Sequence, residues 1–95
     1  MVAGHPQSPT GAPTDEQIEA EILRIVQRRG LQASACPSDV ARALEPDNWR
    51  PLMNRVRDVA SQLAQQGRVD ITQRGEVVPP IGPWKGPIRI RLPQR

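Results

Sequence analysis

The apolar positions that follow residue 14 recur first at the spacing of an α-helix. A capping box formed by Thr14 and Gln17 opens this run, and acids in its first turn complement the helix dipole. Gly30, which adopts a positive φ without steric cost, suits its end. The pattern therefore predicts a helix from Thr14 to Gly30, with one stripe that holds Ile18, Ile22, Ile25, Val26 and Arg29.

A shorter run of helical spacing follows in the segment LQASACPSDVARALEP. Pro37 fits the first position of a helix whose cap is Cys36 or Ser34, since the N–H groups of a first turn have no partner within the helix. Pro46 stops this helix after two turns. The preceding residues 31–35 are compatible with a short strand.

The third helical run is the longest and carries the most charge. Asp47 and Asn48 are both good N-caps, Pro51 is tolerated in the first turn, and Gly67 stops the helix after Gln66. Its predicted core stripe holds Leu52, Met53, Val56, Val59, Ala60 and Leu63.

After residue 67 the apolar period changes from 3.6 to 2. Residues 69–72 alternate as in a strand, Arg74 and Gly75 mark a turn, and residues 76–78 form a second short extended piece. A loop rich in Pro and Gly then leads to IRIRL, with its apolar side chains inward and Arg89 and Arg91 outward. This order predicts an α+β fold, a winged helix-turn-helix of three helices plus a small antiparallel β-hairpin, the wing.

The ends of the chain and its size define the expected domain. Residues 1–13 contain three Pro and two Gly without apolar periodicity, so we expect a disordered N-terminal tail and a winged-helix domain over residues 14–95.

The sequence contains no run of about 20 apolar residues, which is the length needed for a membrane span. The single cysteine, Cys36, agrees with a reducing compartment. We therefore expect a cytoplasmic protein that does not engage a membrane.

The segments CPSDVARAL, WRPLMNRVRDVASQLAQQG, VDITQRGEVV and GPIRIRLP resemble a family of small bacterial proteins, domain-of-unknown-function family 3253. The resemblance covers roughly residues 15 to 93. It implies a winged-helix-like fold and supplies no catalytic or binding residues, since no activity is established for the family.

Charge is unevenly distributed along the chain. The net charge is +3, but residues 1–48 hold four bases and seven acids, whereas residues 49–95 hold nine bases and three acids. An excess of Arg in one half favours an anionic partner, because the planar guanidinium suits phosphates and guanine edges.

The polar face of the third helix is the first candidate binding surface. Its members follow one line at helical spacing, namely Arg50, Asn54, Arg57, Ser61 and Gln65. Such side chains hydrogen-bond base edges and phosphates when a winged-helix domain binds in a major groove. Asp58 flanks the line and would repel phosphate, and Arg55 is expected to pair with Asp58 or a neighbouring helix. An equally ordinary interpretation is a solvated helix face.

Bases of the predicted hairpin favour the binding interpretation. Arg74 lies at its first turn, Lys85 in its loop, and Arg89 and Arg91 on its last strand. Together with the third helix they are placed to contact phosphates in adjacent grooves. The alternative is that Arg89 and Arg91 pair with Asp70 across the sheet.

The sequence does not favour an enzyme. Its only histidine, His5, lies in the predicted tail, so Cys36, Ser34 and Ser38 have no ordered base beside them, and no metal-binding or cofactor-binding spacing is present. A packed position is expected for Trp49 as a core anchor and for Trp84 within its loop.

The expected function is DNA binding with a role related to transcription. It would use Arg50, Asn54, Arg57 and Ser61 of the third helix and Arg74, Lys85, Arg89 and Arg91 of the wing, with no catalytic residues, metal or cofactor. The alternative is a winged-helix protein-interaction module without DNA binding, whose basic face contacts an acidic protein partner. A continuous positive surface between helix and hairpin favours DNA, and interruption by Asp58, Asp70 or Glu76 or by an apolar patch favours a protein partner. Target sequence and oligomeric state do not follow from the sequence.

Overall fold

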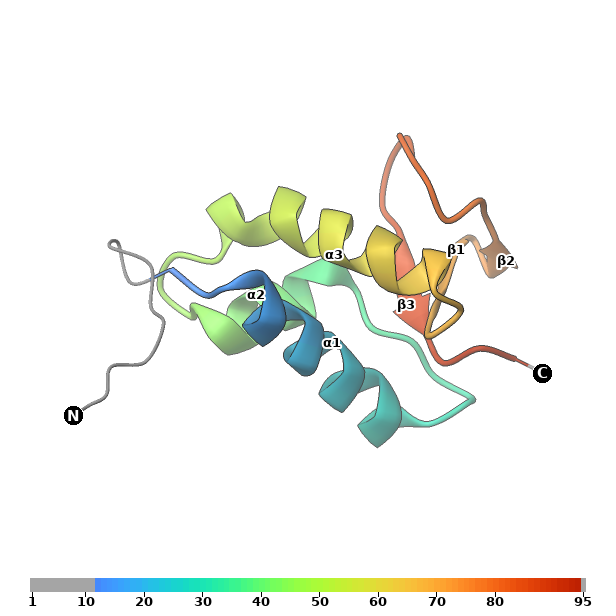
Figure 1. The fold of residues 1–95 in the computed structure, drawn as a ribbon, viewed down its shortest axis with the longest axis horizontal. Helices are drawn as coiled ribbons and strands as arrows, with labels where there is room; N and C mark the ends of the chain where they lie inside the picture. The colour runs from blue at the N-terminus through green and yellow to red at the C-terminus, as the bar shows by residue number, and fades with distance from the viewer. Residues whose placement is uncertain (1–11, 95) are drawn as a thin grey trace.

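The computed structural model describes residues 12–94. Three helices gather at one end of the molecule and a small sheet lies at the other (Figure 1). In chain order the elements are α1 (Asp15–Arg29), α2 (Pro37–Leu44), the single 3₁₀ turn η1 (Arg50–Leu52), α3 (Met53–Gln65), β1 (Asp70–Gln73), β2 (Glu76–Val77) and β3 (Arg89–Arg91). The fold is α+β, as predicted.

Helix α1 begins and ends where local signals place it. The Gln17 N–H donates to Thr14 Oγ1 at 3.1 Å and the Thr14 N–H donates to Gln17 Oε1 at 2.8 Å, which completes the predicted capping box. Gly30 has φ 79° and donates its N–H to the Val26 carbonyl at 3.0 Å. The four apolar residues of the predicted stripe are buried and Arg29, at its end, is exposed, so this helix is confirmed.

Helix α2 uses Cys36, one of the two predicted residues, as its N-cap, with Pro37 in the first turn. Asp39 closes this end, because its Oδ2 accepts from the Cys36 N–H at 3.0 Å and from Arg29 Nη1 at 2.9 Å. Partial burial acts to raise the pKa of Asp39, but the Cys36 and Arg29 hydrogen bonds outweigh it, so the pKa lies below its usual value.

The start of the third helix differs from the prediction. Neither Asp47 nor Asn48 is the N-cap; Trp49 is, and its side chain makes no capping hydrogen bond. The first turn is the 3₁₀ turn η1, in which the Leu52 N–H donates to the Trp49 carbonyl at 3.0 Å. Pro51 lies in this turn, where its missing N–H removes no hydrogen bond, because first-turn N–H groups have no partner within the helix. Gly67, with φ 76°, follows the end of α3 as expected.

The sheet is antiparallel with strand order β2-β1-β3. Arg74 (φ 53°) and Gly75 (φ 83°) turn the chain between β1 and β2, the conformation that two-residue hairpin loops favour. A longer loop leads to β3, which pairs with the other edge of β1. Ile71 lies opposite Ile90 and Thr72 opposite Arg89. The strand proposed for residues 31–35 is reduced to one bridge, between Ala35 and Ile90, because residues 31–33 are exposed and have no strand beside them.

Apolar side chains from all three helices and the sheet form one core. Ile18, Ile22, Val26, Val40, Val56 and Ile90 are fully buried in it. Of the predicted stripe of α3, Met53 is only half-buried and the other five are buried. The arrangement of three helices followed by an antiparallel sheet is compatible with a winged helix.

Of the predicted tail, residues 1–11 lie outside the described residues, and Pro13 is buried. Within residues 12–94, no helix has the length and apolar character needed to cross a membrane.

Candidate nucleic-acid interface

The polar line predicted on the third helix divides into two rows of different exposure. Arg50 and Asn54 are exposed to solvent, whereas Arg57 and Ser61 are half-buried. The difference comes from the loop of residues 79–87, which leaves the sheet on the side of α3 (Figure 1). This loop covers the Arg57 and Ser61 side of the helix.

Arg57 donates hydrogen bonds to the C-terminal part of the loop. Its Nη2 donates to the Trp84 carbonyl at 3.0 Å and its Nη1 to the Gly86 carbonyl at 3.3 Å. Its guanidinium also lies 5.7 Å from the centre of the Trp84 ring. These donors are engaged within the protein, so Arg57 is not the free basic side chain that the helical spacing suggested.

Ser61 of α3 and Trp84 of the loop itself donate hydrogen bonds to the N-terminal part of the loop. Ser61 Oγ donates to the Pro80 carbonyl at 2.6 Å, and Trp84 Nε1 donates to the Pro79 carbonyl at 2.9 Å. Trp84 is half-buried and packs against the core, which confirms its predicted packed position. The helix and the loop are therefore joined along their length.

The exposed row of the helix is shifted from the predicted one. It runs through Arg50, Asn54, Asp58 and Gln62. Sequence reasoning placed Asp58 beside the candidate face and did not include Gln62, because a helical wheel does not show which side a distant loop covers. A groove of about 540 Å³, called here the helix groove, lies beside this row and is lined by Asn54, Arg57, Asp58, Ser61, Ile81, Gly82, Pro83 and Trp84.

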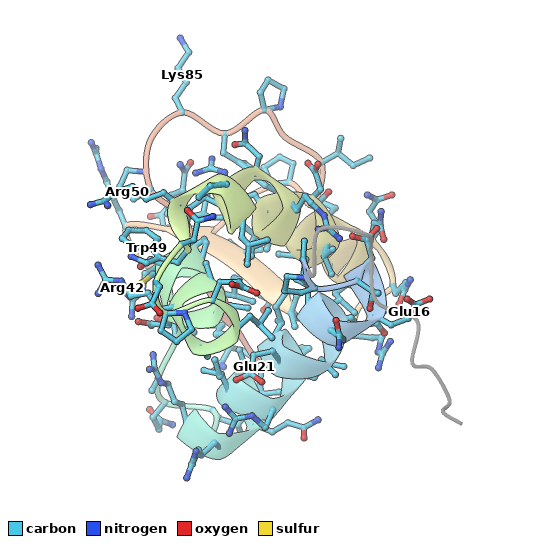
Figure 2. The ribbon with its side chains drawn as sticks, turned by 90° about the vertical axis from the view of Figure 1, so that its left-hand side faces the viewer. Glu16, Glu21, Arg42, Trp49, Arg50 and Lys85 are labelled. Carbon is cyan, nitrogen blue, oxygen red and sulfur yellow. The ribbon has the colours of Figure 1, made fainter. Side chains whose placement is uncertain are left out.

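Three of the predicted hairpin bases line one groove. This hairpin groove has a volume of about 700 Å³ and is lined by Gln73, Arg74, Gly75, Lys85, Gly86, Pro87 and Arg89. Gln73 Nε2 donates to the Lys85 carbonyl at 2.7 Å and to the Pro87 carbonyl at 3.2 Å, which fixes the loop across β1. Lys85 extends from the tip of the loop, away from the body of the molecule (Figure 2).

The fourth predicted hairpin base lies in an adjoining recess. This strand recess has a volume of about 280 Å³ and is lined by Leu31, Gln32, Ala33, Ser34, Thr72, Gly75, Arg89 and Arg91. It shares Gly75 and Arg89 with the hairpin groove. Arg74, Lys85, Arg89 and Arg91 thus lie along one connected surface, and no acid is among the residues that line it.

None of the four bases on this surface forms an ion pair within residues 12–94. Each of the four ion pairs among residues 12–94 includes a side chain of α1: Arg24–Glu21, Arg29–Asp39, Arg55–Asp15 and Arg68–Glu19. Arg55 therefore pairs with the neighbouring helix and not with Asp58. Asp70 stands opposite Arg91 in the sheet without forming an ion pair with it, so the predicted cross-strand pair is not formed.

Arg50 belongs to a second positive feature that the sequence did not reveal. Its guanidinium lies 4.6 Å from the centre of the Trp49 ring, and that of Arg42, on α2, lies 4.4 Å from it. Figure 2 shows Trp49 between the two arginines, on the side of the molecule away from Glu16. Trp49 is half-buried against the core, so it is the predicted anchor and also orients two cations.

The nucleophilic side chains are engaged in local structure. Cys36 Sγ lies 2.8 Å from Ser38 Oγ, and the Ser34 hydroxyl and carbonyl accept from Arg89 at 2.8 and 3.1 Å. His5 lies outside the described residues. Over residues 12–94, no group of three or more His, Cys, Asp or Glu side chains is placed to hold a metal ion.

The fold and this surface define a small α+β protein with a basic surface whose lining residues include no acid. The chain belongs to the family described as "Protein of unknown function (DUF3253)", whose model matches residues 15–93. The predicted family membership is thereby confirmed. No curated protein matches the sequence.

Proposed function

We propose that this protein is a winged-helix DNA-binding protein that binds the duplex through its hairpin and the start of its third helix. The observation that carries the proposal is the connected surface of the hairpin groove and the strand recess, which holds four bases and no lining acid. Bases of this kind bind DNA by displacing condensed counterions from phosphates. Asp70 lies opposite Arg91 and Glu76 opposite Gln73 in the sheet, so two acids border this surface and lower its positive potential.

The residues divide between two kinds of contact. Arg74, Lys85 and Arg89 are placed for phosphates, which position a protein on the duplex without reading sequence. Arg50 and Asn54 lie on the exposed row of α3, and their side chains hydrogen-bond base edges in a major groove. Arg57 and Ser61 act indirectly, by fixing the loop that carries Lys85. The proposal includes no catalytic step.

The test is titration of a fluorescent DNA duplex at low salt, with folding verified by circular dichroism. We expect saturable binding that weakens to a Kd of about 10⁻⁴–10⁻⁶ M at physiological salt, the range of sequence-independent binding. Lys85→Ala should weaken binding to every duplex alike. Arg28→Ala should not, since Arg28 is an exposed base of α1, remote from the hairpin in sequence and absent from both recesses. Folded protein that binds no duplex at low salt contradicts the proposal.

One observation favours a protein-interaction module as a second candidate. Ile81 is 64% exposed at the helix groove, which also contains Asp58, so an apolar side chain and an acid separate α3 from the basic hairpin. A peptide partner would then use the basic face through its own acids. A polyglutamate peptide that displaces DNA at an equal concentration of charges favours this candidate; retention of DNA favours the first.

A further inference from the structure

Among the buried side-chain nitrogen and oxygen atoms of residues 12–94, one has no hydrogen-bond partner. Arg91 Nε is inaccessible to solvent and makes no hydrogen bond within residues 12–94. A guanidinium N–H in this position has lost its water without gaining an acceptor, which is unfavourable for a charged donor. Arg91 lies in β3 and lines the strand recess.

The surroundings of Arg91 supply further donors, and no acid is among the residues that line the recess. Arg89, two residues away on the same face of β3, is held by Ser34, whose Oγ accepts from its Nε at 2.8 Å and whose carbonyl accepts from its Nη2 at 3.1 Å. The Ser34 hydroxyl proton remains able to donate, because that oxygen serves here as an acceptor. The acid opposite Arg91, Asp70, accepts from the Gln94 N–H at 3.4 Å.

We propose that the strand recess is a phosphate-binding site in which Arg91 and Arg89 bind the oxygens. Two planar guanidinium groups suit the several acceptors of a phosphate group, and charge-assisted hydrogen bonds of this kind are the strong ones. A volume of about 280 Å³ accommodates a phosphate group, and a small shift of the half-buried Arg91 side chain into the recess gives its covered Nε–H the acceptor it lacks. The phosphate belongs either to a nucleic-acid backbone or to a small phosphorylated molecule. The site does not depend on the proposed function.

The arginine Nε–H resonances of ¹⁵N-labelled full-length protein test the site. Inorganic phosphate is titrated in, and sodium chloride of equal ionic strength serves as the control. We expect the Arg91 and Arg89 signals to shift saturably with phosphate and to be insensitive to chloride. Shifts that grow linearly with phosphate, or that chloride reproduces, overturn the proposal.

Variants separate the site from general charge. Arg91→Gln should weaken phosphate binding by at least about 10-fold, as expected for loss of a charged hydrogen bond. Arg91→Lys, which keeps the charge but lacks the fork, should weaken it less. Arg28→Gln removes the same charge on α1 and should leave binding unchanged. Equal phosphate affinity of Arg91→Gln and wild type, with both shown to be folded by their amide spectra, overturns the proposal.

A DNA duplex added to the phosphate-saturated protein identifies the source. Release of phosphate in proportion to bound DNA means that the site takes a backbone phosphate, and DNA binding without release means that it takes a small phosphorylated molecule. Either result leaves the site standing. Phosphate binding without any DNA binding overturns only the proposed function, and DNA binding without phosphate binding overturns only the site.

Discussion

At the residue scale, three arginines of one short segment have three different environments. Arg50 is exposed and stacks on Trp49, Arg55 pairs with Asp15 of α1 at 2.7 Å, and Arg57 donates to loop carbonyls. At ideal α-helical spacing, Arg50 and Arg57 lie at similar angles around the helix axis. Only the loop distinguishes them, since it covers one and leaves the other in solvent. The chemistry of an arginine on a helix is therefore decided by what lies opposite.

The engagement of Arg57 predicts a stability effect. Arg57→Ala removes the donors for the Trp84 and Gly86 carbonyls and should lower the free energy of unfolding by about 1–3 kcal/mol. Amide hydrogen exchange of the loop at residues 81–86 should accelerate more than that of α1, because the loop loses one of its attachments to the helix. Urea denaturation and hydrogen exchange measure the two effects.

Asn54→Ala is the matched control for Arg57→Ala. Asn54 is exposed on the same helix, so its truncation should change stability by no more than about 0.5 kcal/mol. If both variants are equally stable, Arg57 is an ordinary solvated side chain and the loop is held by other contacts.

At the scale of elements, the start of α2 depends on a carboxylate that neighbours hold in its charged form. Asp39 accepts from the Cys36 N–H and from Arg29 Nη1, and joins the end of α1 to the beginning of α2. Its pKa is lower in the folded protein than usual. The stabilisation it gives is therefore present above the unfolded-state pKa, about 3.9, and is lost as the pH falls through the folded-state pKa.

The lowered pKa predicts how Asp39→Ala depends on pH. At pH 7 the variant should be less stable by roughly 1–2 kcal/mol, since charged hydrogen bonds at a helix start are lost. The difference from wild type should narrow below about pH 4, as the wild-type carboxylate takes up its proton. Thermal unfolding at a series of pH values measures it. A difference that stays constant down to pH 2 shows that Asp39 stabilises the helix without its charge.

Element-level signals were predictable where their causes are local. The capping box at Thr14, the proline after Cys36 and the glycine after α3 act within a few residues, and the helices they delimit are confirmed. The contacts of Arg57 with Gly86 and of Ser61 with Pro80 join residues 29 and 19 positions apart, so neither periodicity nor spacing reveals them. The N-cap of the third helix was placed wrongly because Asn48 lies in a separate turn, its N–H donating to the Glu45 carbonyl, and the helical bonding begins only at the Trp49 carbonyl.

At the scale of the whole molecule, the sheet and the helices share one core, and Ile90 lies at their junction. Ile90 is fully buried and pairs with Ile71 in the sheet. Its backbone also exchanges two hydrogen bonds with Ala35: the Ala35 N–H donates to the Ile90 carbonyl at 2.8 Å and the Ile90 N–H to the Ala35 carbonyl at 2.7 Å. Ile90→Ala should lower the free energy of unfolding by about 2–5 kcal/mol, through lost burial and a residual cavity.

Ile81→Ala is its matched control. The same truncation at a side chain that is 64% exposed should cost no more than about 0.5 kcal/mol. Chemical denaturation of both variants measures the contrast. Comparable losses would mean that Ile81 is packed and that the helix groove is part of the core.

The distribution of charge over the molecule is the basis of the proposed function. Helix α1 carries a partner in each ion pair of the described chain, whereas the hairpin bases are in none. The bases of the second half that lie in the hairpin are therefore not neutralised by ion pairs. The proposed function predicts that DNA binding depends on where these bases lie and not on the net charge of the protein.

The most direct test compares two triple variants of equal net charge by the salt dependence of duplex binding. One carries Arg74→Gln, Lys85→Gln and Arg89→Gln; the other carries Arg24→Gln, Arg28→Gln and Arg68→Gln, all exposed side chains outside both recesses. The first should lose up to about 2.7 from the slope of log K against log salt, at about 0.9 for each phosphate contact, and the second should keep the wild-type slope. Equal slopes for the two folded variants would contradict the account.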